Sequence, residues 1–152
     1  MRIPSREDIL RLLDKLNEKT AEELESDVIE FKPWLPDPKE NMKIAVEYAV
    51  CFANANGGVI VFGVKDGIKG RNKAIIGCEK YDLDTWRRGI YQDVKPNLTV
   101  DIEELSIPEG ILILVRVPKG PADVPYGTSK GIYKIRVSKH LSLIHIDAAD
   151  EL

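Results

Sequence analysis

Three acidic side chains in the first half of the chain carry the chemistry of a divalent-metal site. Glu25 and Glu30 stand five residues apart, and Asp66 follows an apolar run later in the sequence. Carboxylates that converge on one point can hold Mg²⁺ or Mn²⁺, which would offset charge on a phosphodiester and activate a water molecule. Without a metal or nearby cations the three acids would repel one another, and their pKa values would rise.

The same three residues also have an ordinary structural interpretation. Glu25 fits a loop, Asp66 fits a turn because a glycine follows it, and Glu30 fits a strand face beside a lysine such as Lys32 or Lys134. The acids would then be solvated separately. Both interpretations stay open at the level of sequence.

A set of basic residues from three separate segments could bind phosphate beside these acids. Its members are Lys32, Lys65, Lys69, Arg71, Lys73, Lys134 and Arg136, with Lys139 close behind. The chain has 22 Lys and Arg against 25 Asp and Glu, a formal net charge of −3 and a pI near 5.5. Nucleic-acid binding by the whole surface is therefore disfavoured, and it would depend on a local patch. The alternative is a solvated polar face.

Composition and short motifs narrow the classes of protein to which the chain could belong. The 152 residues match one domain, and no apolar run approaches the length of a membrane span. The charged N-terminal segment has no signal-peptide pattern, and Cys51 and Cys78 lack zinc spacing, so we expect two free thiols in the cytoplasm. The segment 67–73 lacks the GK[ST] ending of a phosphate-binding loop, which gives ATP binding little support.

Periodicity predicts an α+β domain with a mixed β-sheet and helices packed on it. Helices are expected from Ser5 to about residue 17–19, over 41–54 and over 82–94; strands are expected over 27–32, 59–64, 98–105, 111–117 and 132–137. Residues 1–24 are expected to form an N-terminal helical segment, 25–146 the domain proper and 147–152 an acidic tail. The strand at 27–32 is expected to be half-buried.

Several short motifs, in order, resemble the Schlafen AlbA-type domain, also called the divergent AAA-type DNA-binding domain. The motifs are Glu25-Ser26 followed by Glu30-Phe31-Lys32, Cys51-Phe52-Ala53-Asn54 before Gly57-Gly58, Gly63-Val64-Lys65-Asp66, Val94-Lys95-Pro96, Val115-Arg116-Val117-Pro118, Pro125-Tyr126 and Tyr133-Lys134-Ile135-Arg136-Val137. Each motif alone is weak, but their joint order and spacing are specific. The chain departs from the family after Val137, and it lacks the zinc ligands of Schlafen proteins proper.

The resemblance implies a nucleic-acid-binding, in particular DNA-binding, domain of a transcription-regulator-like protein. It implies a second function as well, a metal-dependent endoribonuclease in which Glu25, Glu30 and Asp66 occupy the catalytic and metal-binding positions. The third alternative is an ATP-binding or protein-interaction module. A homo-oligomer is also considered. Apart from Mg²⁺ or Mn²⁺ in the nuclease, no cofactor is expected. The partners expected are DNA or RNA, and no membrane.

Overall fold

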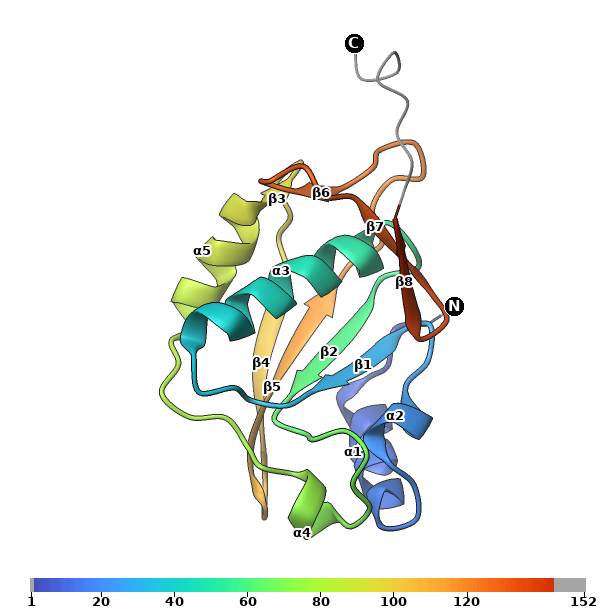
Figure 1. Ribbon diagram of the computed structural model, residues 1–152, viewed down its shortest axis with the longest axis vertical. Coiled ribbons are helices and arrows are strands. Elements are labelled where there is room, and N and C mark those ends of the chain that lie inside the picture. The colour runs from blue at the N-terminus through green and yellow to red at the C-terminus, as the bar shows by residue number, and fades with distance from the viewer. Residues whose placement is uncertain (1, 144–152) are drawn as a thin grey trace.

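The computed structural model describes residues 2–143 of the chain and shows an α+β domain (Figure 1). The helices are α1 (Arg6–Asp14), the 3₁₀ helix η1 (Lys15–Asn17), α2 (Ala21–Leu24), α3 (Pro38–Ala53), α4 (Arg71–Ala74) and α5 (Leu83–Asp93). The strands are β1 (Ile29–Lys32), β2 (Gly58–Phe62), β3 (Val94–Lys95), β4 (Asp101–Ile107), β5 (Gly110–Val117), β6 (Gly127–Thr128), β7 (Lys134–Val137) and β8 (His140–Leu143).

The main sheet has four strands in the order β1-β2-β5-β4. Strands β1 and β2 are parallel and are joined through α3, whereas β5 pairs antiparallel with both β2 and β4. The sheet is therefore mixed, as predicted. Two small antiparallel pairs, β3-β6 and β7-β8, lie outside it.

Side chains alternate across β2 and feed two cores, one on each face of the sheet. Ile60 and Phe62 pack with α3 and α5, and Val59 and Val61 pack with α1 on the opposite face. Both faces of the strand are fully buried, as its unbroken apolar run predicts. Helix α1 and the residues after it are packed on the sheet, because Ile9, Leu16 and Ala21 are buried in this second core.

Local signals set the ends of the helices. Ser5 caps α1 through a capping box with Asp8, and Asp37 caps α3 ahead of Pro38 at its first turn. Gly57 follows α3 with a φ of +73°, where an added Cβ would lie 2.7 Å from the Val117 carbonyl oxygen. The glycine pair is thus the helix stop and tight turn that the sequence predicts.

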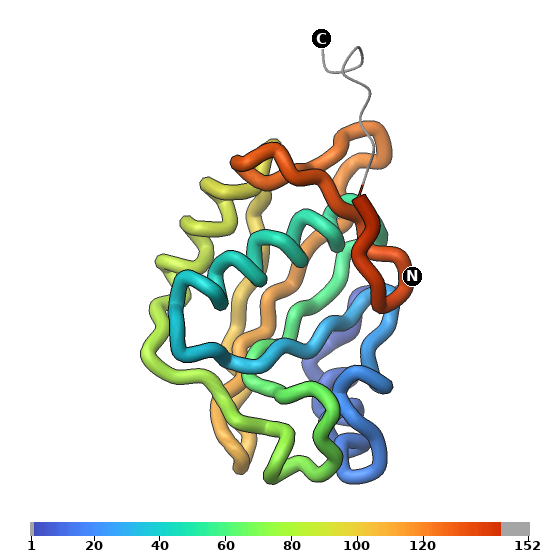
Figure 2. Tube along the Cα trace, in the orientation of Figure 1, coloured from blue at the N-terminus to red at the C-terminus, as the bar shows by residue number. Residues whose placement is uncertain are grey.

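Two expectations about the strands are corrected. Strand β1 is not half-buried: Ile29, Glu30 and Phe31 are all buried, because α1 covers one side and α3 with β7 covers the other. The strand predicted over 132–137 begins only at Lys134, and β8 pairs with it in a hairpin that the sequence did not indicate. Figure 2 shows this hairpin crossing the end of α3 beside β1.

The remaining expectations about composition concern the thiols, the membrane and the tail. Cys51 and Cys78 are free and buried, as predicted. No helix in the described part of the chain has the length and apolar character needed to cross a membrane. The expected acidic tail, 147–152, and His145 lie outside the described residues.

Candidate functional site

Glu25, Glu30 and Asp66, which we call the acid cluster, come together around β1. Glu25 ends α2, Glu30 lies in the middle of β1, and Asp66 follows β2, whose parallel pairing with β1 brings it to the same edge. An Oε2 atom of Glu25 accepts a hydrogen bond from the Phe31 N–H at 2.9 Å, and its carboxyl also shares a hydrogen bond with Glu30.

The Glu30 carboxylate is neutralised by two cations of the same chain. Arg136 of β7 donates from Nη1 to Oε1 of Glu30, and the Lys32 Nζ lies 3.3 Å from Oε2. The Arg136 side chain is fully buried, whereas Lys32 keeps 19% of its side-chain surface exposed. Glu30 is thus a paired internal charge, as a buried carboxylate must be.

Arg136 is a structural link between the β7–β8 hairpin and β1. Its Nη2 donates to the carbonyl oxygens of Ser26 at 2.8 Å and Ile29 at 3.0 Å, and its guanidinium lies 5.3 Å from the centre of the Phe52 ring. Within the described residues its buried Nε has no hydrogen-bond partner. The guanidinium makes its hydrogen bonds to groups of the same chain around β1, and the Arg136 side chain does not face solvent.

Burial and mutual repulsion shift the acids' proton affinities. Desolvation, the hydrogen bond with Glu30 and the charge of Glu30 raise the pKa of Glu25 to about 9, so Glu25 is protonated at neutral pH. Desolvation also raises the pKa of Asp66, which lies on the exposed side of the cluster; Lys32 opposes this rise and Glu30 adds to it. Tyr48 and Glu30 together outweigh desolvation and raise the pKa of Lys32.

A divalent metal does not fit this arrangement, although carboxylates are the ligands that Mg²⁺ and Mn²⁺ prefer. Across residues 2–143, no three His, Cys, Asp or Glu side chains lie close enough to hold a metal. Both oxygens of Glu30 already face cations of the same chain. The acids converge, but as a set balanced by Lys32 and Arg136.

The predicted basic residues divide into two groups. Lys65, Lys69 and Lys73 are exposed on the segment 65–73, which we call the lysine loop, and make none of the ion pairs found in the described chain. The loop is fixed at Gly70, whose N–H donates to the Leu16 carbonyl oxygen at 2.6 Å. The lysines therefore project from an anchored loop.

The other predicted basic residues are paired with carboxylates of the same chain. Arg71 makes a bidentate pair with Glu109, at 2.7 and 3.0 Å, and also contacts Asp14. Lys134 pairs with Glu47 of α3, and the hydrogen bond raises its pKa. With Lys32 and Arg136 paired to Glu30, four of the seven predicted phosphate-binding cations already have carboxylate partners.

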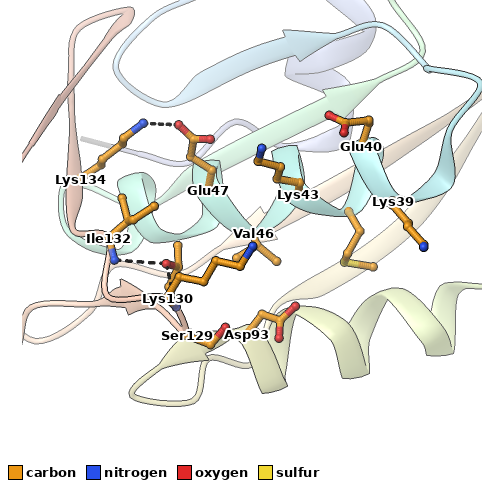
Figure 3. A pocket seen from close by; sticks show the side chains of 12 residues that line it. Lys39, Glu40, Lys43, Val46, Glu47, Asp93, Ser129, Lys130, Ile132 and Lys134 are labelled. Atoms are coloured by element: carbon orange, nitrogen blue, oxygen red, sulfur yellow. Dashed lines mark hydrogen bonds and ion pairs between the residues drawn. The ribbon is translucent and has the colours of Figure 1, made fainter.

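One candidate binding feature was not predicted from the sequence. A groove lies between α3 and the turn 128–132, with exposed lysines that were not among the predicted basic residues (Figure 3). Tyr126 of the Pro125-Tyr126 motif lies in a Pro/Gly loop, but it is only 9% exposed and packs in the α3 core. Its burial leaves no ring face free for a base.

Residues 25–144 match the family model described as Schlafen, AlbA_2. The chain belongs to this family. The match begins at Glu25 and takes in the acid cluster, the lysine loop and Arg136, and it confirms the resemblance seen in the motifs. No curated protein matches the sequence.

Two solved structures share the fold of this AlbA_2 domain. The DIP2311 protein from Corynebacterium diphtheriae aligns with a TM-score of 0.68 and 18% identity, over 90% of this chain and 29% of that one. The N-terminal domain of a Nitrosomonas europaea protein, named as related to the ATP-dependent DNA helicase RecG, aligns with a TM-score of 0.52 and 22% identity, over 85% of this chain and 82% of that one. The chain therefore spans under a third of DIP2311, and these identities establish the fold alone.

Proposed function

We propose that this AlbA_2 domain binds nucleic acid, DNA in particular, through the lysine loop, as part of a transcription-regulator-like protein in the cytoplasm. The observation that carries the proposal is the division among the basic residues. Lys65, Lys69 and Lys73 are exposed, lack carboxylate partners in the described chain and project from an anchored loop. Phosphate binding by lysine needs free ammonium groups near one another but no base contacts.

The lysine loop has an anchored backbone and acidic neighbours at Glu22 and Glu23. Arg71 ties the loop to Glu109 and Asp14, so its backbone is held while the lysines stay free. Lys139 reaches from the β7–β8 turn to the Glu22 carbonyl oxygen at 3.0 Å, and Lys69 is close enough to Glu23 to lower that residue's pKa. The segment Glu22–Glu23 thus has a lysine on each side.

The comparisons support the same class of partner. The resemblance of this chain to the AlbA_2 family implies nucleic-acid binding. One structural neighbour is named as related to a DNA helicase. The buried thiols fit a reducing compartment.

The test is a titration of fluorescently labelled single-stranded and duplex DNA and RNA with a matched pair of triple variants. Charge reversal at the loop (K65E, K69E and K73E together) should weaken binding at least tenfold. The control reverses three exposed cations elsewhere (K80E, R88E and K119E), so that net charge is equal. Equal affinities for the two variants, or no binding by the wild type, would contradict the proposal.

A second candidate is endoribonuclease activity, and the convergence of the acid cluster favours it. The pKa of Glu25 is raised to about 9 by its burial and by the neighbouring Glu30, and a carboxyl group that holds its proton at neutral pH can act as a general acid. Lys32, the more exposed partner of Glu30, lies beside them as a cation for phosphate.

Cleavage of structured RNA with Mg²⁺, Mn²⁺ or a chelator tests this second candidate and its dependence on metal. E25Q and D66N should each abolish cleavage while the circular dichroism spectrum stays unchanged. A wild-type protein that leaves the RNA intact under all three conditions would remove nuclease activity from consideration. So would variants that cleave as fast as the wild type.

A further inference from the structure

The groove between α3 and the turn 128–132, which we call the side groove, has the size and lining of a small-molecule site. Its volume is about 430 Å³, within the range of roughly 300–1,000 Å³ typical of ligand pockets. Met42 and Val46 of α3 and Ile132 of the turn supply apolar surface. Ile132 is 44% exposed, so apolar surface stays open to solvent there.

The walls of the side groove are fixed. The Thr128 hydroxyl accepts hydrogen bonds from the N–H groups of Lys130 and Ile132, and the Ser129 N–H donates to the Asp93 carbonyl oxygen at 2.8 Å. The turn is thereby tied to the end of α5. A preformed groove binds a ligand without the entropic cost of ordering its walls.

Unpaired lysines surround the apolar surface. Lys39 and Lys43 of α3 and Lys130 of the turn are exposed and make no ion pair within residues 2–143, whereas Lys134 is bound to Glu47. Figure 3 shows Lys130 reaching from the turn toward Val46. Free ammonium groups beside an apolar surface match a ligand that is anionic at one end and apolar at the other.

Acceptors occupy the wall at the end of α5. Figure 3 places the Asp93 carboxylate and Ser129 on this wall, on the other side of α3 from Glu40 and Glu47. A carboxylate accepts hydrogen bonds from an amino group, as acidic side chains do from the exocyclic amine of cytosine. The acceptors therefore favour a base that carries an amino group.

We infer that the side groove binds one nucleotide of a single-stranded nucleic acid. The base lies on Met42, Val46 and Ile132 with its amino group toward Asp93, and the phosphate lies among Lys39, Lys43 and Lys130. The inference rests on the proposed nucleic-acid function and adds a base-binding site away from the lysine loop. Single strands are commonly held by bases stacked on aromatic rings and by phosphates beside basic residues; in the side groove aliphatic side chains take the place of the rings.

Methionine methyl NMR tests the groove directly, because the chain has only two methionines and M42L assigns the Met42 signal. Cytidine 5′-monophosphate should shift this signal saturably, and uridine 5′-monophosphate should bind several-fold more weakly. The double variant K43E and K130E should lose the shift, while the equally charged control K80E and K119E keeps it. Inorganic phosphate alone should leave the Met42 methyl unmoved.

Single-strand titrations separate this inference from the function on which it rests. The groove variant should weaken oligonucleotide binding about fivefold or more relative to its control. If oligonucleotides bind but neither the Met42 signal nor the groove variant responds, the groove inference is overturned and the lysine-loop proposal stands. If cytidine monophosphate binds while oligonucleotides do not, the lysine-loop function fails and the inference of a single-strand site is overturned with it, because the groove would then take only the free nucleotide. A full shift with phosphate alone would exclude the base from the groove.

Discussion

The acid cluster and the lysine loop contain the same kinds of cation but use them in opposite ways. At the acid cluster, Arg136 and Lys32 are both paired with the buried Glu30. At the loop, Lys65, Lys69 and Lys73 face solvent without partners in the described chain, and only Arg71 is tied down. The presence of a basic residue in a family motif therefore does not make its charge available to a ligand, because neighbouring carboxylates can already pair with it.

The largest effect should follow from breaking the pair inside the acid cluster. R136M leaves the buried Glu30 carboxylate with Lys32 as its only cation, and unpairing a buried charge costs ~3–5 kcal/mol. Urea unfolding should show a loss of this size for R136M, and less than the sum of both single losses for the double variant R136M with E30Q. K65M on the loop is the control and should change stability by less than about 0.5 kcal/mol. A loss as small as that control would mean that Arg136 is not held inside.

The second effect concerns Arg71, which sits in the lysine loop but pairs with Glu109. R71A should lower the free energy of unfolding by about 1 kcal/mol, because a well-formed, partly exposed ion pair contributes about that much. Oligonucleotide affinity, measured well below the melting temperature, should change far less than in K69A. An equal loss of affinity in both variants would show that Arg71 contacts the nucleic acid itself.

The third effect is on pH dependence. Because the pKa of Glu25 is raised from 4.5 to about 9 in the folded protein, its contribution to stability is fully present below about pH 4.5. That contribution is lost progressively as the pH rises toward 9. The wild type should therefore lose stability between pH 6 and 9 in thermal unfolding, and E25Q should lose less. Parallel pH curves for the two proteins would argue against a protonated Glu25.

The smallest effect is expected at the Lys134–Glu47 pair on the surface of α3. Both side chains keep more than a quarter of their surface exposed, at 27% and 30%, and such pairs contribute ~0–1 kcal/mol. K134M should barely alter unfolding by urea. A loss of stability comparable to that of R136M would contradict the distinction between the partly exposed Lys134 and the buried Arg136 on β7.

Much of the fold followed from local patterns. The apolar stripe of 82–94 predicted α5 to within a residue at each end, the Ser5 capping box is present, and the glycines after α3 form the expected turn. These signals act over a few residues, so the sequence displays them directly. Strand β8 was missed because His140–Leu143 is short and mostly exposed and shows no clear alternation of buried residues.

The site was less accessible to sequence reasoning because its contacts are long-range. The sequence indicated Lys32 as a partner of Glu30, but the second partner, Arg136, lies 106 residues away on β7. Nothing in the order of residues distinguishes the buried Arg136 from the exposed Lys69. The side groove is assembled from α3, the end of α5 and the turn 128–132, and no local pattern links these segments.

The salt dependence of single-stranded DNA binding tests most directly whether free lysines of the loop contact phosphate. Each lysine that neutralises a phosphate contributes about one unit or slightly less to the slope of log affinity against log salt. Replacing Lys65, Lys69 and Lys73 together by glutamine should therefore reduce the slope by about two to three units. A slope unchanged from the wild type would contradict the account, since the loop's lysines would then not be the groups that meet the nucleic acid.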